Sequence, residues 1–346
     1  MKRAFAAILL ACLAVLQLLT GCAAPAAQPL QRYEASFLNL FDTVTTIVGY
    51  AESEEAFRAA VQPIHDELLI YHQLFDVYND YEGVANLKTI NDHAGEGPVE
   101  VDRRIIDLLL LCREMYDATG GRMNAAMGSV LLLWHEARNA GLEEPETAKL
   151  PEPELLTAAA KHRDFDDVII DEAHGTVEIA DPQLRLDVGA IAKGYAVEQV
   201  ARSAPEGMLI SVGGNVRATG ARPTDGSPWV IGVQNPDAEA GEYLHTLYIV
   251  DSSVVSSGDY QRYYTVDGVR YHHIIDPDTL YPAAYWRAVT VICADSGIAD
   301  ALSTALFTLP MEEGQALLDR FGAVALWVDF HGEILYSEGF SDYIRT

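Results

Sequence analysis

The order of segment types in the second half of the chain constrains the fold most. From Asp166 onward, short apolar and β-branched runs that predict strands follow one another with few helical stretches between them. The regular alternation of strand and helix that is typical of a parallel α/β sheet is missing from this pattern. The sequence therefore predicts an α+β fold, with a mostly antiparallel or mixed sheet and helices that flank it.

Apolar periodicity gives the expected elements. Helices are expected at 53–75, 101–119, 124–138, 152–161, 189–202, 296–308 and 312–321. Strands are expected at 38–50, 168–171, 176–180, 208–212, 229–233, 247–250, 253–257, 261–275, 324–329 and 334–336. Segments with chemical character are spread over this whole length. We therefore expect residues 36–346 to form a single catalytic unit rather than separable domains.

The N-terminal segment predicts export. Lys2 and Arg3 precede an apolar run that ends in Leu19-Thr20-Gly21-Cys22. This order is typical of a secretion signal, and the run is short for a membrane span. The end of the run resembles the lipobox of bacterial lipoproteins. We predict a signal peptide at 1–21, a lipid on Cys22 and a flexible tether at 22–35, which would anchor the protein outside the cytoplasm on a bacterial membrane. The alternative is a plain signal peptide.

The chain is strongly acidic, with a formal net charge of −28. A field of this sign repels nucleic acid, which is excluded as a partner because no Lys/Arg-rich block opposes the repulsion. An anionic small ligand would need a local cationic device, either a metal ion or a helix start. Cys112 and Cys293 lie in apolar helix and strand patterns, so we expect two buried thiols rather than a disulfide.

The segment DVGAIAKGYA, residues 187–196, predicts a strand end, a glycine turn and a helix start. Unpaired N–H groups at a helix start favour a phosphate, Gly189 and Gly194 allow close approach, and Lys193 adds a positive charge. The spacing matches neither a P-loop nor a dinucleotide-binding fingerprint. An ordinary helix that begins with glycine is the alternative.

Asp300 and Thr304 lie four residues apart near the start of another expected helix, so both side chains share one face. A carboxylate and a hydroxyl suit magnesium, which takes its remaining ligands from water and phosphate. A helix-start acid with an unrelated threonine is the alternative.

Three other features have both a functional and a structural interpretation. His272 and His273 would face opposite sides of a strand, so one of them could act as a general base or simply be structural. Tyr78 could stack on a flat ring or lie on the surface. The loops 211–215 and 257–260 could allow close ligand approach or form ordinary turns.

Taken together, these segments resemble the ApbE family, the bacterial FAD:protein FMN transferases, from about Phe37 to Leu335. The motifs that carry the resemblance are FDTVTTI at Phe41, VYN at Val77, GGRMNAAMGSVLLLWH at Gly120, LDVGAIAKGYA at Leu186, SVGGNVRATG at Ser211, SSGDYQRYY at Ser256, YHHIIDP at Tyr271 and ADALSTALF at Ala299. The chain departs from the family at Arg122-Met123-Asn124, where Ala-Phe-Asp is frequent, and at Tyr81-Glu82-Gly83, where a Ser-Glu pair is frequent.

The resemblance implies a site for FAD and Mg²⁺ in residues 36–346. The implied metal ligands are Asp300, Thr304 and the main-chain carbonyl of Ala190. The implied cofactor contacts are Phe41, Tyr78, Arg122, Met123, Asn124, Asp187, Lys193 and His273. The proton acceptor would be His273, with Asp259 as the second choice. The Lys193 turn and the Asp300 helix must then lie together in space.

The implied reaction is Mg²⁺-dependent transfer of FMN from FAD to a Thr or Ser hydroxyl of an acceptor protein outside the cytoplasm, with release of AMP. Two alternatives remain open. One is an Mg²⁺-dependent FAD pyrophosphatase that yields FMN and AMP. The other is a non-catalytic lipoprotein that binds FAD.

Overall fold

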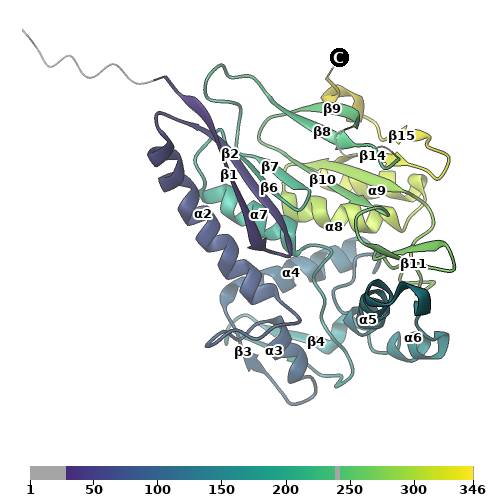
Figure 1. Cartoon of the computed structure of the whole chain (residues 1–346). Coiled ribbons are helices and arrows are strands. Elements are labelled where there is room, and N and C mark those ends of the chain that lie inside the picture. Colours follow the sequence, from purple (N-terminus) through teal and green to yellow (C-terminus); the bar gives the residue numbers. More distant parts are fainter. Residues whose placement is uncertain (1–28, 238–241, 346) are drawn as a thin grey trace, which may run out of the picture.

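The computed structural model describes residues 29–237 and 242–345 (Figure 1). The predicted signal peptide at 1–21 and the predicted lipid attachment at Cys22 lie outside the described residues. The first strand begins at Gln31, so the last part of the predicted tether belongs to a strand. The predicted boundary at residue 36 therefore falls inside this strand rather than before the folded unit.

The largest sheet in the described part of the chain has eight strands in the order β1-β2-β6-β7-β10-β13-β14-β15. All neighbouring strands run antiparallel, which confirms the predicted sheet type. The strands are β1 (Gln31–Leu40), β2 (Thr43–Ala51), β6 (Leu209–Val212), β7 (Asn215–Ala218), β10 (Ser253–Gly258), β13 (Ala288–Cys293), β14 (Val324–Val328) and β15 (Ile334–Tyr336).

Smaller sheets complete the strand inventory of these residues. A three-stranded sheet has the order β3-β5-β4, and β8-β9 and β11-β12 form separate antiparallel pairs. Their bounds are β3 (Val99–Glu100), β4 (Val168–Asp171), β5 (Thr176–Ile179), β8 (Trp229–Gln234), β9 (Tyr243–Ile249), β11 (Tyr263–Val266) and β12 (Val269–His272). The single strand expected at 261–275 is thus a hairpin of two short strands.

The helices follow the predicted apolar spacing closely. They are α2 (Glu54–Phe75), α3 (Leu87–Asp92), α4 (Arg103–Ala118), α5 (Gly128–Glu143), α6 (Pro153–Ala159), α7 (Ala192–Ser203), α8 (Ser296–Phe307) and α9 (Met311–Phe321), with 3₁₀ turns η1 (Pro145–Thr147), η2 (Phe165–Asp167) and η3 (Phe340–Tyr343). Helix α3 was not expected. It begins with a capping box in which the side chains of Asn86 and Thr89 each accept from the other's backbone N–H.

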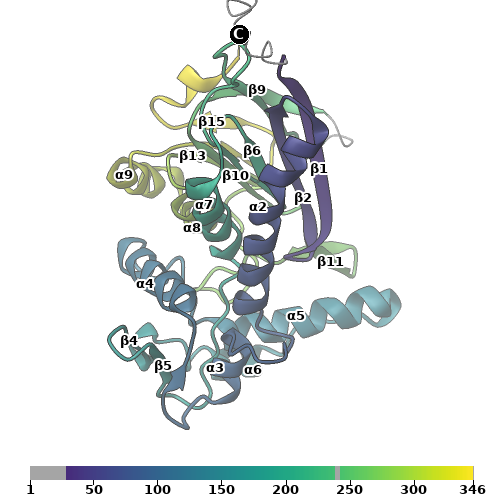
Figure 2. The same cartoon turned by 90° about the vertical axis from the view of Figure 1, so that its left-hand side faces the viewer.

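Both faces of the main sheet are covered (Figures 1 and 2). Helices α2, α7 and α8 lie on one face, and the β8–β9 hairpin lies on the other. Strand β13 shows this division, because Val289 and Val291 belong to the core on the helical side, while Ala288 and Ile292 pack with Trp229 on the hairpin side. Alternation of side chains across a strand produces the two cores.

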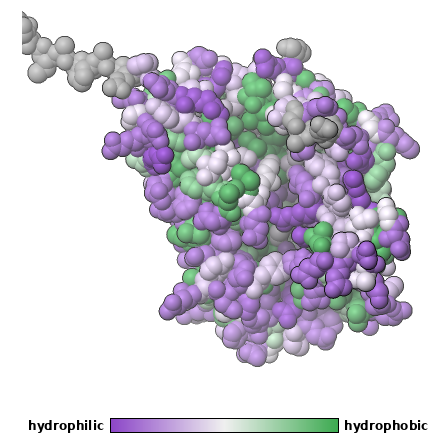
Figure 3. Space-filling view, in the orientation of Figure 1, coloured by the Kyte–Doolittle hydropathy of each residue, from purple (hydrophilic) through white to green (hydrophobic). Residues whose placement is uncertain are grey.

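Polar side chains cover most of the face seen in Figure 3. Exposed apolar side chains occur near the β1–β2 hairpin, where Leu38 is 78% exposed and Val44 is 53% exposed. Among the described helices, none combines the length and the apolar character that crossing a bilayer requires.

Candidate active site

Helices α7 and α8 pack against each other on the helical side of the main sheet (Figures 1 and 2). Their starts meet at Gly194. A Cβ atom at this position would lie 2.2 Å from the carbonyl oxygen of Ser296 and 2.5 Å from Cβ of Asp300. Only glycine therefore allows the helices this separation. The two segments that carry Lys193 and Asp300 are thus brought together, although they are far apart in the sequence.

Asp300 is 4% exposed and lies at the centre of this junction. Its Oδ2 accepts hydrogen bonds from Gly194 N (2.9 Å) and Asn215 Nδ2 (3.1 Å), and Lys193 Nζ lies 3.7 Å away. Burial raises the pKa of the carboxyl group, and Lys193 opposes that shift. All three contacts go to Oδ2, which leaves Oδ1 available for a cation.

The donor set around Asp300 fits a hard divalent cation. Gly194 N donates to Asp300 rather than to Ala190, and no hydrogen bond to the Ala190 carbonyl occurs among the described residues. Thr304 lies one helical turn beyond Asp300 and is partly buried. The same part of the chain contains no group of three or more His, Cys, Asp or Glu side chains that could hold a metal. One carboxylate with two neutral oxygens suits Mg²⁺, which keeps waters and binds phosphates, better than zinc.

The turn before α7 places Asp187 next to this junction. Its Oδ1 accepts from Gly189 N (2.8 Å), and its own N–H donates to the Ala125 carbonyl (2.8 Å). Burial raises the pKa of Asp187, while His135, Arg262 and Lys193 act in the opposite direction. The Asp187 carboxylate therefore shapes the turn through its own backbone and lies within the field of several cations.

The two neighbouring histidines occupy different environments, but His273 lies beyond the end of β12 at His272, so the two do not alternate along one strand as predicted. His272 is 7% exposed, and its Nε2 donates to the Ala283 carbonyl (3.0 Å). His273 is exposed, and its Nδ1 lies 3.3 Å from the Arg262 carbonyl. A carbonyl only accepts, so in the neutral ring Nδ1 carries the proton and Nε2 keeps its lone pair.

Protein around the exposed His273 ring lowers its pKa to about 3, with contributions from Arg262, His272 and Lys193. A ring can be open to water and still be surrounded by protein atoms when it lies on a concave part of the surface. His273 is therefore neutral at pH 7 and has a free lone pair at Nε2, and the negative charge of a bound diphosphate would raise its pKa toward the range in which a general base works.

An aromatic platform lies beside these groups. The Tyr78 ring is stacked on His135, with ring centroids 4.6 Å apart at 20°, and Tyr78 is 46% exposed. Burial raises the pKa of Tyr78, and the charge of Asp187 adds to the shift. Phe41 lies in the β1–β2 turn, where its N–H donates to Nδ1 of His72 (3.2 Å). The exposed Tyr78 ring is suited to stacking on a flat ligand.

The predicted contacts at Arg122, Met123 and Asn124 lie elsewhere. Met123 is 1% exposed and packs in the main core. Arg122 forms ion pairs with Asp276 (3.3 Å) and Asp278 (2.7 Å). Arg122 and Asn124 line a hollow of about 350 Å³ that neither Lys193 nor Asp300 lines. The structure therefore does not unite all predicted cofactor contacts in one cavity, and these three roles stay predictions.

Asp259, the second choice for the proton acceptor, is held in an ion pair. Its Oδ2 lies 3.3 Å from Nε of Arg287, and its N–H donates to the Arg287 carbonyl. The other oxygen, Oδ1, is buried without a hydrogen-bond partner in the described part of the chain. This fixed carboxylate is a weaker candidate than the free Nε2 of His273.

Four residues of the site were not singled out from the sequence. Asn215 is 2% exposed and binds Asp300, and His135 supports Tyr78. Arg138 and Arg262 influence the pKa of Tyr78, and Nε of Arg138 is buried without a partner among the described residues. Asn215 follows the glycine pair of SVGGN, and His135 and Arg138 lie three residues apart on one helix face. These sequence positions were the signals from which Asn215, His135 and Arg138 could have been predicted as site residues.

An antiparallel sheet with helices on one face, and a helix junction that fits a divalent cation, define an α+β protein suited to a phosphate-bearing ligand. A comparison with protein families matches residues 41–327 to the ApbE family. The chain belongs to the ApbE family, as its motifs predicted.

Curated relatives match most of the chain. The FAD:protein FMN transferase of Treponema pallidum (strain Nichols) is 34% identical over 278 residues, covering 75% of this chain and 75% of the relative. A protein of the same name from Klebsiella pneumoniae (strain 342) is 34% identical over 286 residues, covering 79% of this chain and 86% of the relative. Their names are those of flavin-transferring enzymes.

Solved structures share the fold. The crystal structure of the ApbE protein from Thermotoga maritima has a TM-score of 0.81 and 31% identity, covering 91% of this chain and 100% of that chain. The flavin transferase ApbE from Vibrio cholerae has a TM-score of 0.75 and 24% identity, covering 91% of this chain and 100% of that chain. The predicted α+β architecture is thereby confirmed.

Proposed function

We propose that this chain is an Mg²⁺-dependent FAD:protein FMN transferase. It would transfer FMN from FAD to a Thr or Ser hydroxyl of an acceptor protein and release AMP. The observation that carries the proposal is the α7–α8 junction, where Lys193 lies 3.7 Å from the buried carboxylate of Asp300. Membership of the ApbE family and the names of the curated relatives support the same activity.

Asp300, Thr304 and the Ala190 carbonyl would hold the Mg²⁺ ion. The bound ion would supply charge neutralisation at the FAD diphosphate and so stabilise AMP as a leaving group. Lys193 lies in the first turn of α7, just after Ala190. It would pair with a phosphate oxygen and add a second positive charge to that of the ion. A strongly acidic chain needs such a local concentration of positive charge in order to bind a dinucleotide.

Tyr78 would stack on the flavin ring and orient the flavin-side phosphate toward the acceptor. Nε2 of His273 would accept the proton of the acceptor hydroxyl as the oxygen attacks the flavin-side phosphorus. The bond from that phosphorus to the bridging oxygen breaks, and AMP leaves with the bridging oxygen. One phosphoester forms between the acceptor and FMN, and one diphosphate bond is lost.

The proposed location is the outer surface of a bacterial membrane, with the protein anchored through lipid on Cys22. The support is the order of charged, apolar and small residues before Cys22, which lies outside the described residues. Acceptor proteins would then also lie outside the cytoplasm. Labelling with a radioactive fatty acid in cells, with Cys22→Ser as the matched control, tests this part of the proposal.

The activity is tested by incubating the protein with FAD, Mg²⁺ and a candidate acceptor domain, and by mass spectrometry of the acceptor. We expect a mass increase of one FMN, which Asp300→Ala abolishes, while Asp319→Asn on the surface of α9 leaves it intact. Free FMN without acceptor modification would favour the pyrophosphatase. Recovery of intact FAD would favour a binding protein. Full modification by Asp300→Ala would refute the metal assignment.

A further inference from the structure

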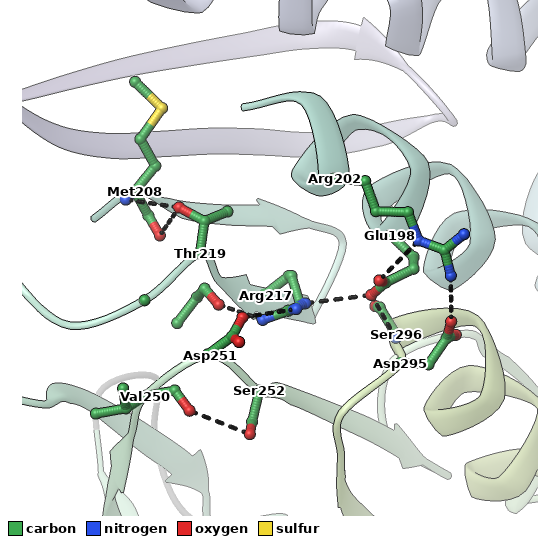
Figure 4. A network of polar contacts seen from close by, with 12 residues as sticks. Glu198, Arg202, Met208, Arg217, Thr219, Val250, Asp251, Ser252, Asp295 and Ser296 are labelled. Carbon is green, nitrogen blue, oxygen red and sulfur yellow. Dashed lines mark hydrogen bonds and ion pairs between the residues drawn. The ribbon is translucent and has the colours of Figure 1, made fainter. Parts of the chain in front are cut away.

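A buried carboxylate outside the catalytic set lies one helical turn beyond Gly194. Glu198 on α7 is 5% exposed and occupies the centre of a polar network that joins α7, β7 and the start of α8 (Figure 4). A buried charge is costly unless it is fully paired. The partners of Glu198 therefore indicate what this carboxylate holds in place.

Both oxygens of Glu198 are engaged. Oε2 accepts from Ser296 N (3.0 Å) and from Arg217 Nε (3.1 Å), and Oε1 accepts from Arg202 Nε (3.2 Å). Each arginine also pairs with a second carboxylate, Arg217 with Asp251 (2.9 Å) and Arg202 with Asp295 (3.0 Å). The contact with Ser296 differs from the others because Ser296 is the first residue of α8.

Two successive turns of α7 thus hold the same residue of α8. Gly194 packs against the carbonyl oxygen of Ser296, and Glu198 accepts from the Ser296 N–H. Asp300 lies one turn further along α8, on the side that faces Gly194 N. The way in which α7 holds Ser296 therefore sets the distance between Asp300 on α8 and the turn that carries Ala190 and Lys193.

We propose that Glu198 is a positioning residue for the divalent cation. By holding the first peptide of α8 against α7, it keeps the Asp300 carboxylate and the Ala190 carbonyl at the separation that one cation requires. This inference rests on the proposed function for the identity of the site. The inference goes beyond the proposed function, because it makes the metal affinity depend on Glu198, a carboxylate that contacts neither the cation nor the substrate.

The test compares metal affinity in the full chain with FAD bound and no acceptor present. Mn²⁺ is the probe, and the EPR signal of free Mn²⁺ reports binding without turnover. We expect Glu198→Ala to weaken Mn²⁺ binding by about tenfold or more, as loss of a group that orients a metal ligand does. Glu198→Gln, whose amide oxygen is still able to accept from Ser296 N, should restore part of the affinity.

Asp251→Asn is the matched control, because it removes the outer partner of Arg217 and leaves the Ser296 contact in place. This variant should bind Mn²⁺ like the unmodified chain. FAD affinity without metal should be the same in all of these proteins. A role in stability alone would lower the melting temperature of the Glu198 variants without changing the Mn²⁺ affinity of the folded protein.

Unchanged Mn²⁺ affinity in folded Glu198→Ala would overturn the proposal. If that variant does not fold, Glu198→Met replaces it, because methionine fills a similar volume and has no oxygen to accept from Ser296 N; unchanged Mn²⁺ affinity in Glu198→Met would overturn the proposal equally. If Mn²⁺ affinity is unchanged in the Glu198 variant and the unmodified chain transfers FMN, the positioning role is refuted and the proposed function is kept. Weakened Mn²⁺ binding in a chain that transfers no FMN would support the positioning role and refute the transferase. A chain with FAD that binds no Mn²⁺ overturns both.

Discussion

Gly194 decides at the scale of one residue how closely α7 approaches α8. Its N–H donates to Asp300, and the absence of a side chain admits the Ser296 carbonyl. A methyl group at this position meets backbone rather than the flexible end of a side chain, so the helices must separate. The same hydrogen bond that keeps Gly194 N away from the Ala190 carbonyl also leaves that carbonyl free for a cation.

Gly194→Ala is therefore expected to lower the free energy of unfolding by about 1 to 3 kcal/mol, the usual cost of overpacking a core. Mn²⁺ binding in the presence of FAD should weaken strongly, because Asp300 moves with α8. Thermal or urea unfolding and a Mn²⁺ titration measure the two effects. Gly314→Ala is the control, since its Cβ would meet side chains rather than backbone: Cδ2 of Leu306 at 2.8 Å and Cζ2 of Trp327 at 3.3 Å. Equal metal affinity in both variants would contradict the prediction.

His273 makes a second prediction at this scale, on the pH dependence of stability. Its pKa is about 3 in the folded protein and about 6.5 in an unfolded chain. Between these values the unfolded chain binds a proton that the folded protein does not bind, so stability is lost as the pH falls below about 6.5. We expect the melting temperature to fall less steeply from pH 7 to pH 5 in His273→Asn than in the unmodified chain.

The control for this measurement is His331→Asn, which removes a histidine in the turn between β14 and β15. All three proteins are compared without flavin, because a bound diphosphate would change the field at His273. If the melting temperature falls equally with pH in His273→Asn and in the unmodified chain, the His273 ring is protonated equally in the folded and unfolded states, and the prediction is wrong.

The loop after α2 is the element that presents Tyr78. Asp76 holds it through four hydrogen bonds: Oδ1 accepts from Tyr78 N (2.7 Å) and Asn79 N (3.0 Å), and Oδ2 accepts from Asn79 Nδ2 (2.9 Å) and Tyr81 Oη (2.8 Å). Tyr81 also contacts His72, which binds the backbone of Phe41. One carboxylate thus links the aromatic platform to the β1–β2 turn.

Asp76→Ala should release this loop and weaken FAD binding by about tenfold, equivalent to roughly 1.4 kcal/mol. The physical reason is the entropy of ordering Tyr78, which the ligand would then have to supply. Quenching of flavin fluorescence measures the affinity. Asp80→Ala, which removes an exposed partner of Lys88, is the control. A loss of thermal stability without any change in FAD affinity would show that the loop does not contact the flavin.

Elements were predictable where the signal is local. The apolar spacing gave α2 and α4 within a few residues, and the capping pair Asn86 and Thr89 was a readable signal for α3 that the polar surroundings obscured. Asp267-Gly268, with φ of 49° and 80°, was likewise a readable turn signal inside the run that became β11 and β12. Helix α5 begins at Gly128 because its N–H donates to the Arg185 carbonyl, and no local pattern reveals that contact.

The candidate site likewise has features that could be predicted from the sequence and features that only the fold reveals. Helix-start chemistry predicted a phosphate site at Lys193 and a cation site at Asp300 separately, and the family resemblance predicted that the two lie together. The stack of His135 on Tyr78 joins residues 57 positions apart, and only the fold brings them together. Contacts of this kind depend on tertiary structure, so sequence periodicity could not have located them.

At the scale of the whole molecule, one hydrophobic core joins the sheet to the helices beneath it. Cys112 on α4 and Cys293 on β13 belong to the same core cluster, with exposures of 0% and 5%. Both are free thiols, as predicted, and burial raises the pKa of each. A continuous core of this kind favours cooperative unfolding. That expectation agrees with the prediction of a single catalytic unit.

Both buried thiols should therefore become reactive together. In a urea series, pulse labelling with a thiol reagent followed by peptide mass spectrometry should give Cys112 and Cys293 the same midpoint, because opening either site requires the whole core to unfold. Peptide-level detection keeps label at Cys22 from contributing to the result. Tryptophan fluorescence is the independent probe and should share the midpoint. Labelling of Cys112 at lower urea than Cys293 would mean that α4 and the small sheet β3-β5-β4 unfold before the main sheet, as two units rather than one.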